Sequence, residues 1–318
     1  MPRGGADAER DGTGAGRDGP LHPAHLHSRP MPADSRRSLE DLRAVWGDGP
    51  LFAETGDVVY ERDGVTIVCG YEEGSTSERF FIVKQPPFVE AYLELCALHR
   101  GATIVELGIA EGGSTALLAL AARPEKLISL ELDPDPLAHL ARFIADHDLE
   151  AVVRPIYGID QADRDGVARA VEGELGGDPI DLVIDDASHL LAETRTSFET
   201  LFPRLRPGGT YIIEDWRNDQ VMRDTVAEAI QNGGEEERRA FAAGIADAMR
   251  TGTSPSRPTP LTDLAVELLL CAGSWSSGAI ETVAFTPFWI AVTRGPDAID
   301  PATFRVRSLF RDHFGYLS

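Results

Sequence analysis

Strand-like and helix-like segments alternate from Phe88 to Ile213, and this alternation is the strongest constraint on the fold. Short runs rich in Val, Ile and Leu are each followed by a segment with apolar residues at helical spacing. Buried strands joined by helical crossovers form a parallel sheet covered on both faces. The pattern predicts a doubly wound α/β fold. The predicted strands are Thr103–Leu107, Leu127–Leu132, Ala151–Ile156, Ile180–Ile184 and Thr210–Ile213; the predicted helices are Phe88–Arg100, Ser114–Ala122, Pro136–Asp146, Arg164–Leu175 and Leu191–Leu205.

Further segments beyond these predict how the sheet is completed. A Pro-Gly-Gly sequence at 207–209 is predicted to be the turn between the last crossover helix and the last parallel strand. Helices are predicted at Val221–Gln231 and Leu261–Ala272. Ala279–Phe285 and Phe288–Val292 are predicted to form an antiparallel pair, which makes the sheet mostly parallel and seven-stranded.

Composition divides the chain into regions. Residues 1–37 are rich in Gly, Pro, Arg and Asp, and we expect a disordered tail. Residues 38–87 are predicted to be a small β-rich N-terminal cap, and residues 88–298 the main domain. The segment 233–260 is charged and then rich in Ser, Thr and Pro, so we predict a lid-like insertion; residues 299–318 are predicted to be a tail. Within the cap we predict a helix at Leu39–Trp46 and strands at Val58–Tyr60, Val65–Gly70 and Arg79–Val83.

The formal net charge of −22 argues against nucleic acid as a partner, because such binding depends on Lys and Arg neutralising phosphates. A small or neutral acceptor is the better expectation. The sequence has no run of about 18 apolar residues, so no membrane-spanning helix is predicted. The first residues lack the apolar core of a secretory signal, and the three cysteines are widely spaced; we expect a cytoplasmic protein with reduced thiols.

A glycine-rich turn follows the first predicted strand of the main domain. Gly108, Gly112 and Gly113 lie between that strand and a helix that begins near Ser114. Glycine lets a ligand approach the backbone, and the free N–H groups of a helix N-terminus bind a carboxylate. The glycine spacing differs from the G-x-G-x-x-G sequence of dinucleotide sites, which argues against a dinucleotide site. A turn with a purely structural role is the alternative. The segment from Val105 to Ser114 resembles motif I of class I S-adenosylmethionine-dependent methyltransferases.

This resemblance implies a cofactor site of S-adenosyl-L-methionine at the ends of the strands, to which Gly108, Gly112, Gly113 and Ser114 would contribute. Glu106 would hold the methionine ammonium group, and Asp160 or Gln161 would meet the adenine, unless that segment is a simple loop. Glu131 ends the second predicted strand, where a carboxylate can accept hydrogen bonds from both ribose hydroxyls, as in NAD enzymes too. Asp185, at the end of the fourth predicted strand, is also predicted to bind the cofactor.

Acidic pairs end the fourth and fifth predicted strands. Asp185 and Asp186 follow one strand, and Glu214 and Asp215 follow the next. The carboxyl ends of parallel strands face the ligand crevice, so these four carboxylates are predicted to converge. Like charges repel unless a cation neutralises them, and Mg²⁺ prefers oxygen ligands. The alternative is that the pairs cap helices or line the pocket without a metal.

The sequence D-D-x-S-H at 185–189, with the later E-D at 214–215, resembles the macrocin- and mycinamicin-type sugar O-methyltransferases. That resemblance implies that Asp186, Glu214 and Asp215 bind Mg²⁺ and that His189 is the general base. The family pair is more usually two aspartates, so Glu214 departs from the pattern. For His189, a structural or capping role is the alternative.

The combined motifs predict a Mg²⁺-assisted O-methyltransferase of antibiotic biosynthesis that acts on a sugar hydroxyl of a natural product or nucleotide sugar. A sugar hydroxyl is a weak acid; a metal ion stabilises the developing alkoxide, and an imidazole, with an ordinary pKa of about 6.5, can take the proton. The alternatives are a cephalosporin hydroxylase-like enzyme or a methyltransferase for phenols or carboxylates on the same fold, a non-catalytic cofactor-binding relative, and an NAD-dependent oxidoreductase. Whether the chain forms a homo-oligomer is left open.

Overall fold

The computed structural model describes residues 51–52, 58–70, 74–217, 234, 261–274 and 278–310, all of which belong to the unit Ser38–Ser318. Several predictions lie outside these residues: the tail at 1–37, the helices Leu39–Trp46 and Val221–Gln231, and the insertion at 233–260 apart from Gly234. In the described part of the chain, no helix is long and apolar enough to cross a membrane.

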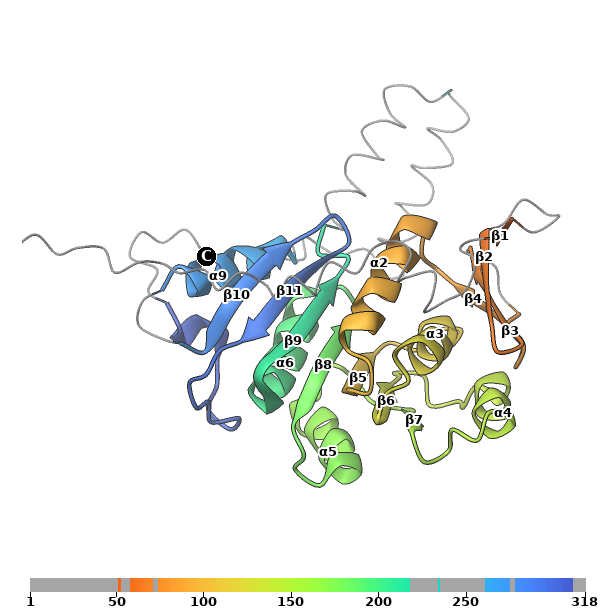
Figure 1. The fold of residues 1–318 in the computed structure, drawn as a ribbon. Helices are drawn as coiled ribbons and strands as arrows, with labels where there is room; N and C mark the ends of the chain where they lie inside the picture. The colour runs from red at the N-terminus through yellow and green to blue at the C-terminus, as the bar shows by residue number, and fades with distance from the viewer. Residues whose placement is uncertain are drawn as a thin grey trace, which may run out of the picture. The chain divides into compact units, whose positions relative to one another are not determined.

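A seven-stranded sheet is the centre of the fold (Figure 1). Its strand order is β10-β11-β9-β8-β5-β6-β7, and β11 is antiparallel to both of its neighbours while the five strands from β9 to β7 are parallel. The predicted doubly wound, mostly parallel sheet is confirmed. The strands are β5 (Thr103–Leu107), β6 (Lys126–Leu130), β7 (Val153–Ile156), β8 (Ile180–Asp185), β9 (Leu205–Glu214), β10 (Ile280–Phe285) and β11 (Trp289–Arg294).

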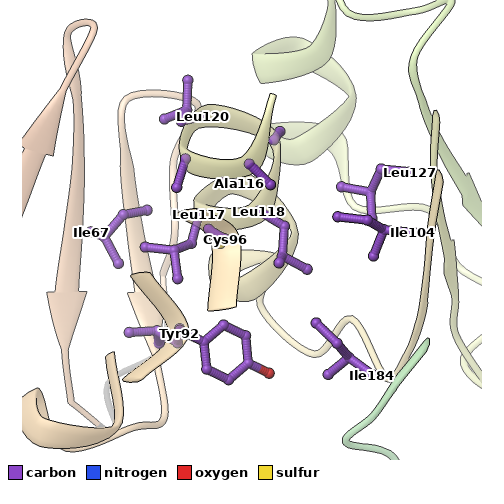
Figure 2. Close-up of a cluster of buried hydrophobic side chains, with 14 of the residues drawn as sticks. Ile67, Tyr92, Cys96, Ile104, Ala116, Leu117, Leu118, Leu120, Leu127 and Ile184 are labelled. Carbon is purple, nitrogen blue, oxygen red and sulfur yellow. The ribbon is translucent and has the colours of Figure 1, made fainter. Parts of the chain in front are cut away.

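Helices cover both faces of this sheet because successive strand residues point to opposite sides. Ile104 of β5 packs in one hydrophobic cluster, and the next residue, Val105, packs in another. Figure 2 shows part of the first cluster, in which Leu117 and Leu118 lie among side chains of the strands and of a neighbouring helix. The first face carries α2 (Pro86–Leu98), α3 (Gly113–Ala122) and α4 (Ala138–Asp146); the second carries α5 (Arg164–Leu175), α6 (Leu191–Leu201) and α9 (Thr262–Ala272).

The predicted β-rich cap is a four-stranded sheet of order β1-β2-β3-β4. Ile67 and Phe80 of this sheet are fully buried in the same hydrophobic cluster as Leu117 of α3. The small sheet and the main sheet therefore share one core. The strands are β1 (Leu51–Phe52), β2 (Val58–Arg62), β3 (Val65–Cys69) and β4 (Arg79–Ile82).

The segment between α6 and β9 differs from the prediction. The predicted helix to Leu205 ends at Leu201 and continues as a single 3-10 turn, Phe202–Arg204. Pro203 has no N–H to donate to the carbonyl of Glu199, which accepts instead from the Arg164 side chain at 3.0 Å. The Pro-Gly-Gly sequence at 207–209 is part of β9, as an irregularity between two pairs with β8. It is not the separate turn that we predicted.

Gly113, at the start of α3, lies directly against β4. A Cβ atom added there would be 2.2 Å from the carbonyl oxygen of Phe81. Only glycine permits this approach, so the residue that we predicted to bind cofactor has a packing role between the helix and the small sheet.

We expect Gly113→Ala to lower the free energy of unfolding by about 3 kcal/mol, because backbone must move to admit the methyl group. The matched control is Gly173→Ala in α5, where an added Cβ meets nothing within 4 Å. That change should stabilise the protein by up to about 1 kcal/mol through helix propensity. Urea unfolding of both variants checks this; similar midpoints for the two would contradict the packing role.

Candidate functional site

The predicted site residues lie at one edge of the main sheet, where β5, β6, β8 and β9 end. Leu107 pairs with Asp185, and Asp185 pairs with Ile213, so three strand ends are in register. A cavity of 420 Å³ opens beside them. The predicted residues that line it are Gly108, Glu131, Asp160, Gln161 and Asp186. A second cavity, of 670 Å³, lies at the other end of the strands beside Ile180 and Leu205, away from every predicted site residue.

The glycine-rich turn brings two loops into backbone contact. Gly108 has a φ of 91°, and a Cβ atom there would be 2.2 Å from the carbonyl oxygen of Asp186. The backbone N–H of Asp186 donates to the carbonyl of Leu107 at 3.0 Å. The turn after β5 and the loop after β8 are therefore fixed to each other. Gly112, with a φ of 81°, lies away from the cavity, near Phe80 and Leu140.

Glu131 directly follows β6, and its side chain binds the backbone of the glycine-rich turn. Its Oε2 accepts hydrogen bonds from the backbone N–H groups of Ile109 and Ala110, at 2.8 and 3.1 Å, while the side chain lines the cavity. Asp160 is exposed on the cavity wall and accepts from the N–H of Ala162 at 2.8 Å. Both carboxylates lie where a polar ligand in the cavity can reach them.

Glu106 does not reach the cavity. It is 1% exposed, and its Oε2 accepts from the hydroxyls of Thr115 and Ser129, both at 2.7 Å. Burial raises the pKa of this carboxyl group, while hydrogen bonds from Ser114, Ser129 and Thr115 oppose that shift. The structure thus places Glu106 and Ser114 in a buried network beneath the turn. Oε1 of Glu106 has no hydrogen-bond partner among the described residues, and the contact of Glu106 and Ser114 with the cofactor stays a prediction.

Asp185 is likewise an internal residue. Gln161, Ser197 and Tyr211 donate to its carboxylate at 2.6, 2.6 and 2.7 Å. Burial raises its pKa to about 6, against the hydrogen bonds of Ser197 and Tyr211. The other end of Gln161 accepts from the Ser188 hydroxyl at 2.7 Å. Asp185 therefore holds the loop that carries Asp186 and His189, and its contact with the cofactor stays a prediction.

Removal of the Asp185 carboxylate should cost about 3 kcal/mol of unfolding free energy, because three buried donors lose their acceptor. Chemical denaturation of Asp185→Ala measures this. Asp178→Ala is the control, since Asp178 is exposed and should change stability by less than about 0.5 kcal/mol. Equal losses in the two variants would refute the network role.

Asp186, His189 and Asp215 meet at the cavity's edge. Each offers one ligand atom, and these atoms lie within 4.8 Å of one another. The Nε2 atom of His189 is 3.8 Å from Oδ1 of Asp186 and 3.8 Å from Oδ2 of Asp215. Burial raises the pKa of Asp215, an effect that His189 opposes. The structure therefore brings these three predicted site residues together.

The backbone at this point is strained. His189 has a φ of 55° and Asp215 a φ of 49°, a region that non-glycine residues seldom adopt. Such a conformation costs on the order of 1 kcal/mol and persists where the surrounding structure holds it. The loop after β8 is held by the Gln161–Ser188 hydrogen bond, and the N–H of Asp215 donates to the carbonyl of Phe288 at 3.2 Å.

Glu214 is separate from this group. It is fully buried, and its Oε2 accepts from Lys84 Nζ at 2.7 Å while its Oε1 accepts from the Tyr92 hydroxyl. Burial and the nearby Asp186 raise its pKa, and Lys84 opposes the shift. Both oxygens of Glu214 have partners, and Glu214 is not in the group formed by Asp186, His189 and Asp215; its role as a metal ligand stays a prediction.

Lys84 is a site residue that the sequence analysis missed. It lies between β4 and α2, and its Nζ is 2.6 Å from Oδ2 of Asp186 as well as 2.7 Å from Glu214. One signal was available: Lys84 and Lys126 are the only lysines in the chain. Lys84 also follows the predicted strand Arg79–Val83 directly, two residues before the Pro86-Pro87 sequence.

Part of the chain matches a known protein family. Residues 105–216, which include both acidic loops and the glycine-rich turn, match a family described as a methyltransferase domain. This part of the chain is a methyltransferase domain. The predicted resemblance to class I methyltransferases is confirmed. Lys84 and Tyr92, which both contact Glu214, precede the matched part of the chain.

The methyltransferase domain and its flanks are similar to named enzymes. One is the 8-demethyl-8-alpha-L-rhamnosyl tetracenomycin-C 2'-O-methyltransferase of Streptomyces olivaceus, 30% identical over 240 residues, which are 70% of this chain. The match spans 56% of that enzyme, so the chain covers little more than half of its length. Another is the mycinamicin VI 2''-O-methyltransferase of Micromonospora griseorubida, 43% identical over 75 residues, or 19% of each chain. A solved structure of the MycE methyltransferase from the mycinamycin biosynthetic pathway, in complex with Mg, SAH and mycinamycin VI, is 23% identical with a TM-score of 0.42 and covers 66% of this chain and 49% of its own.

Proposed function

We propose that this chain is an S-adenosylmethionine-dependent O-methyltransferase that methylates a sugar hydroxyl of a glycosylated small molecule with the help of Mg²⁺. The observation that carries the proposal is the convergence of Asp186, His189 and Asp215 beside the cavity of the glycine-rich turn. The methyltransferase domain and the names of its relatives, which are O-methyltransferases of glycosylated natural products, support it.

The cavity beside Gly108 and Glu131 is the proposed cofactor site. Its volume of 420 Å³ lies within the range of small-molecule sites, about 300–1,000 Å³. Glu131 would accept hydrogen bonds from the ribose hydroxyls, and Asp160 on the opposite loop would meet the adenine amino group. Gly108 would let the methionine moiety lie against backbone at the end nearest Asp186.

The donors at the cavity's edge fit a divalent cation. Mg²⁺ is commonly bound by one or two carboxylates, with water and substrate oxygens as the other ligands. Asp186 and Asp215 would hold it, and a bound cation would stabilise an alkoxide that forms on the acceptor. His189 would take the hydroxyl proton at Nε2. Bound S-adenosylmethionine would supply the methyl group, so the products would be the methyl ether and S-adenosylhomocysteine, with the displaced hydroxyl proton held on His189.

The cofactor site is tested by titrating S-adenosylhomocysteine into Glu131→Ala in a calorimeter. Loss of two charge-assisted hydrogen bonds to ribose should weaken binding at least about tenfold, or roughly 1.4 kcal/mol. Glu125→Ala is a matched control because Glu125 is exposed near the start of β6, at the other end of the strand. Undiminished affinity in Glu131→Ala would exclude the ribose role.

His189→Ala distinguishes a base from a metal ligand. Methyl transfer to rhamnosylated or other glycosylated polyketides should fall about 100-fold or more, while Mn²⁺ affinity, measured by electron paramagnetic resonance, stays within about threefold of wild type. Asp215→Asn should weaken Mn²⁺ binding, and EDTA should suppress turnover of the wild type until Mg²⁺ is restored. If His189→Ala loses Mn²⁺ binding instead, His189 is a ligand; if phenols are methylated faster than sugars, the acceptor class is wrong.

A further inference from the structure

Lys84 is a buried cation that contacts two strand ends of the methyltransferase domain. Its side chain is 5% exposed, and its ammonium group donates to Glu214 of β9 and to Asp186 of the loop after β8. It also lies 4.8 Å from the ring centre of Phe88 and 5.0 Å from that of Tyr92. Lysine is almost never fully buried unless its charge is paired.

The contacts account for that burial in electrostatic terms. Burial alone would disfavour the charged amine, but the carboxylates of Glu214 and Asp186 outweigh it and raise the pKa of Lys84. Glu214 in turn is fully buried, and Lys84 is the cation that its carboxylate contacts among the residues described. Breaking such a pair on one side leaves an uncompensated buried charge, whereas removal of both partners can be nearly neutral.

Asp186 connects this pair to the proposed cation site. Its Oδ2 is 2.6 Å from Lys84 Nζ, and its Oδ1 is 3.8 Å from the His189 imidazole. The Asp186 carboxylate therefore faces Lys84 with Oδ2, and it faces His189 and the proposed cation site with Oδ1. A divalent cation bound by Oδ1 would lie on the same carboxylate as the ammonium ion.

We propose that Lys84 is an internal counter-cation that shares Asp186 with the divalent cation, so that the small N-terminal sheet sets the affinity of the cation site. This inference rests on the cation site proposed above. Two cations on one carboxylate oppose each other, and such coupling is reciprocal. Loss of Lys84 should strengthen Mn²⁺ binding, and Mn²⁺ should stabilise the protein more when Lys84 is absent.

The test compares wild type, Lys84→Met and Lys126→Met in thermal unfolding, with EDTA or with MnCl₂, and in Mn²⁺ titrations followed by electron paramagnetic resonance. Methionine keeps the apolar stem and removes the charge. Lys126 is the only other lysine and pairs with Glu174 near the surface at 3.1 Å, so its variant controls for loss of an amine. In EDTA, Lys84→Met should unfold at least about 5 °C below wild type. Mn²⁺ should raise its Tm by more than it raises that of wild type, with a dissociation constant at least about threefold lower.

A second pair of variants keeps the test decisive if Lys84→Met does not fold. Glu214→Gln removes the buried carboxylate, and Lys84→Met with Glu214→Gln removes both charges of the pair. The double variant should regain much of the Tm that Lys84→Met loses in EDTA, and it should bind Mn²⁺ more tightly than Glu214→Gln alone.

The outcomes separate this inference from the proposed function. If wild type binds no Mn²⁺, the cation site fails and the shared role of Asp186 fails with it. If wild type binds Mn²⁺ but loss of Lys84 leaves the dissociation constant unchanged or raises it, only the counter-cation role is overturned. Equal Mn²⁺-induced shifts of Tm in Lys84→Met and wild type would overturn it as well.

Discussion

Parallel strands that end at one edge of a sheet bring together the residues at their ends. The last residue of β8, the last residue of β9 and the residue after each of them carry four carboxylates. Their mutual repulsion has to be met group by group. Asp185 is surrounded by three neutral donors, and Glu214 by an ammonium ion and a phenol. Asp215, whose side chain is 47% exposed, and Asp186 keep oxygens that face His189. Burial thus separates the two carboxylates that support the structure from the two that can meet a ligand.

The small N-terminal sheet is part of this arrangement. Its buried residues share a hydrophobic core with α3, and the segment that follows it carries Lys84 into the carboxylate cluster. Gly113 permits the close contact between β4 and the first turn of α3. The residues matched as a methyltransferase domain begin at 105, yet the electrostatic balance at the end of β9 depends on residues 84 and 92.

Local patterns predicted the framework because each depends on neighbours in sequence. Apolar runs between helical segments located β5 to β9, and strand direction then brought Asp186, His189 and Asp215 to one edge. The same patterns did not reveal Lys84, which lies 102 positions from Asp186 and is paired only through the tertiary fold. Nor can a pattern tell on which side of a turn a polar side chain finds its donors. That is why the sequence did not show that Glu106 accepts hydrogen bonds from Thr115 and Ser129, or that Asp185 accepts them from Ser197 and Tyr211.

The contact between Gly108 and the carbonyl of Asp186 has a consequence for how such a scaffold can diverge. Backbone against backbone leaves no side chain whose size can be adjusted, so the spacing between these two loops is set by the main chain itself. A descendant of this protein that recognises a different molecule would have to change the rim around that fixed pair of loops. Substitutions should therefore be rare at position 108, and new specificity should arise without moving the two loops.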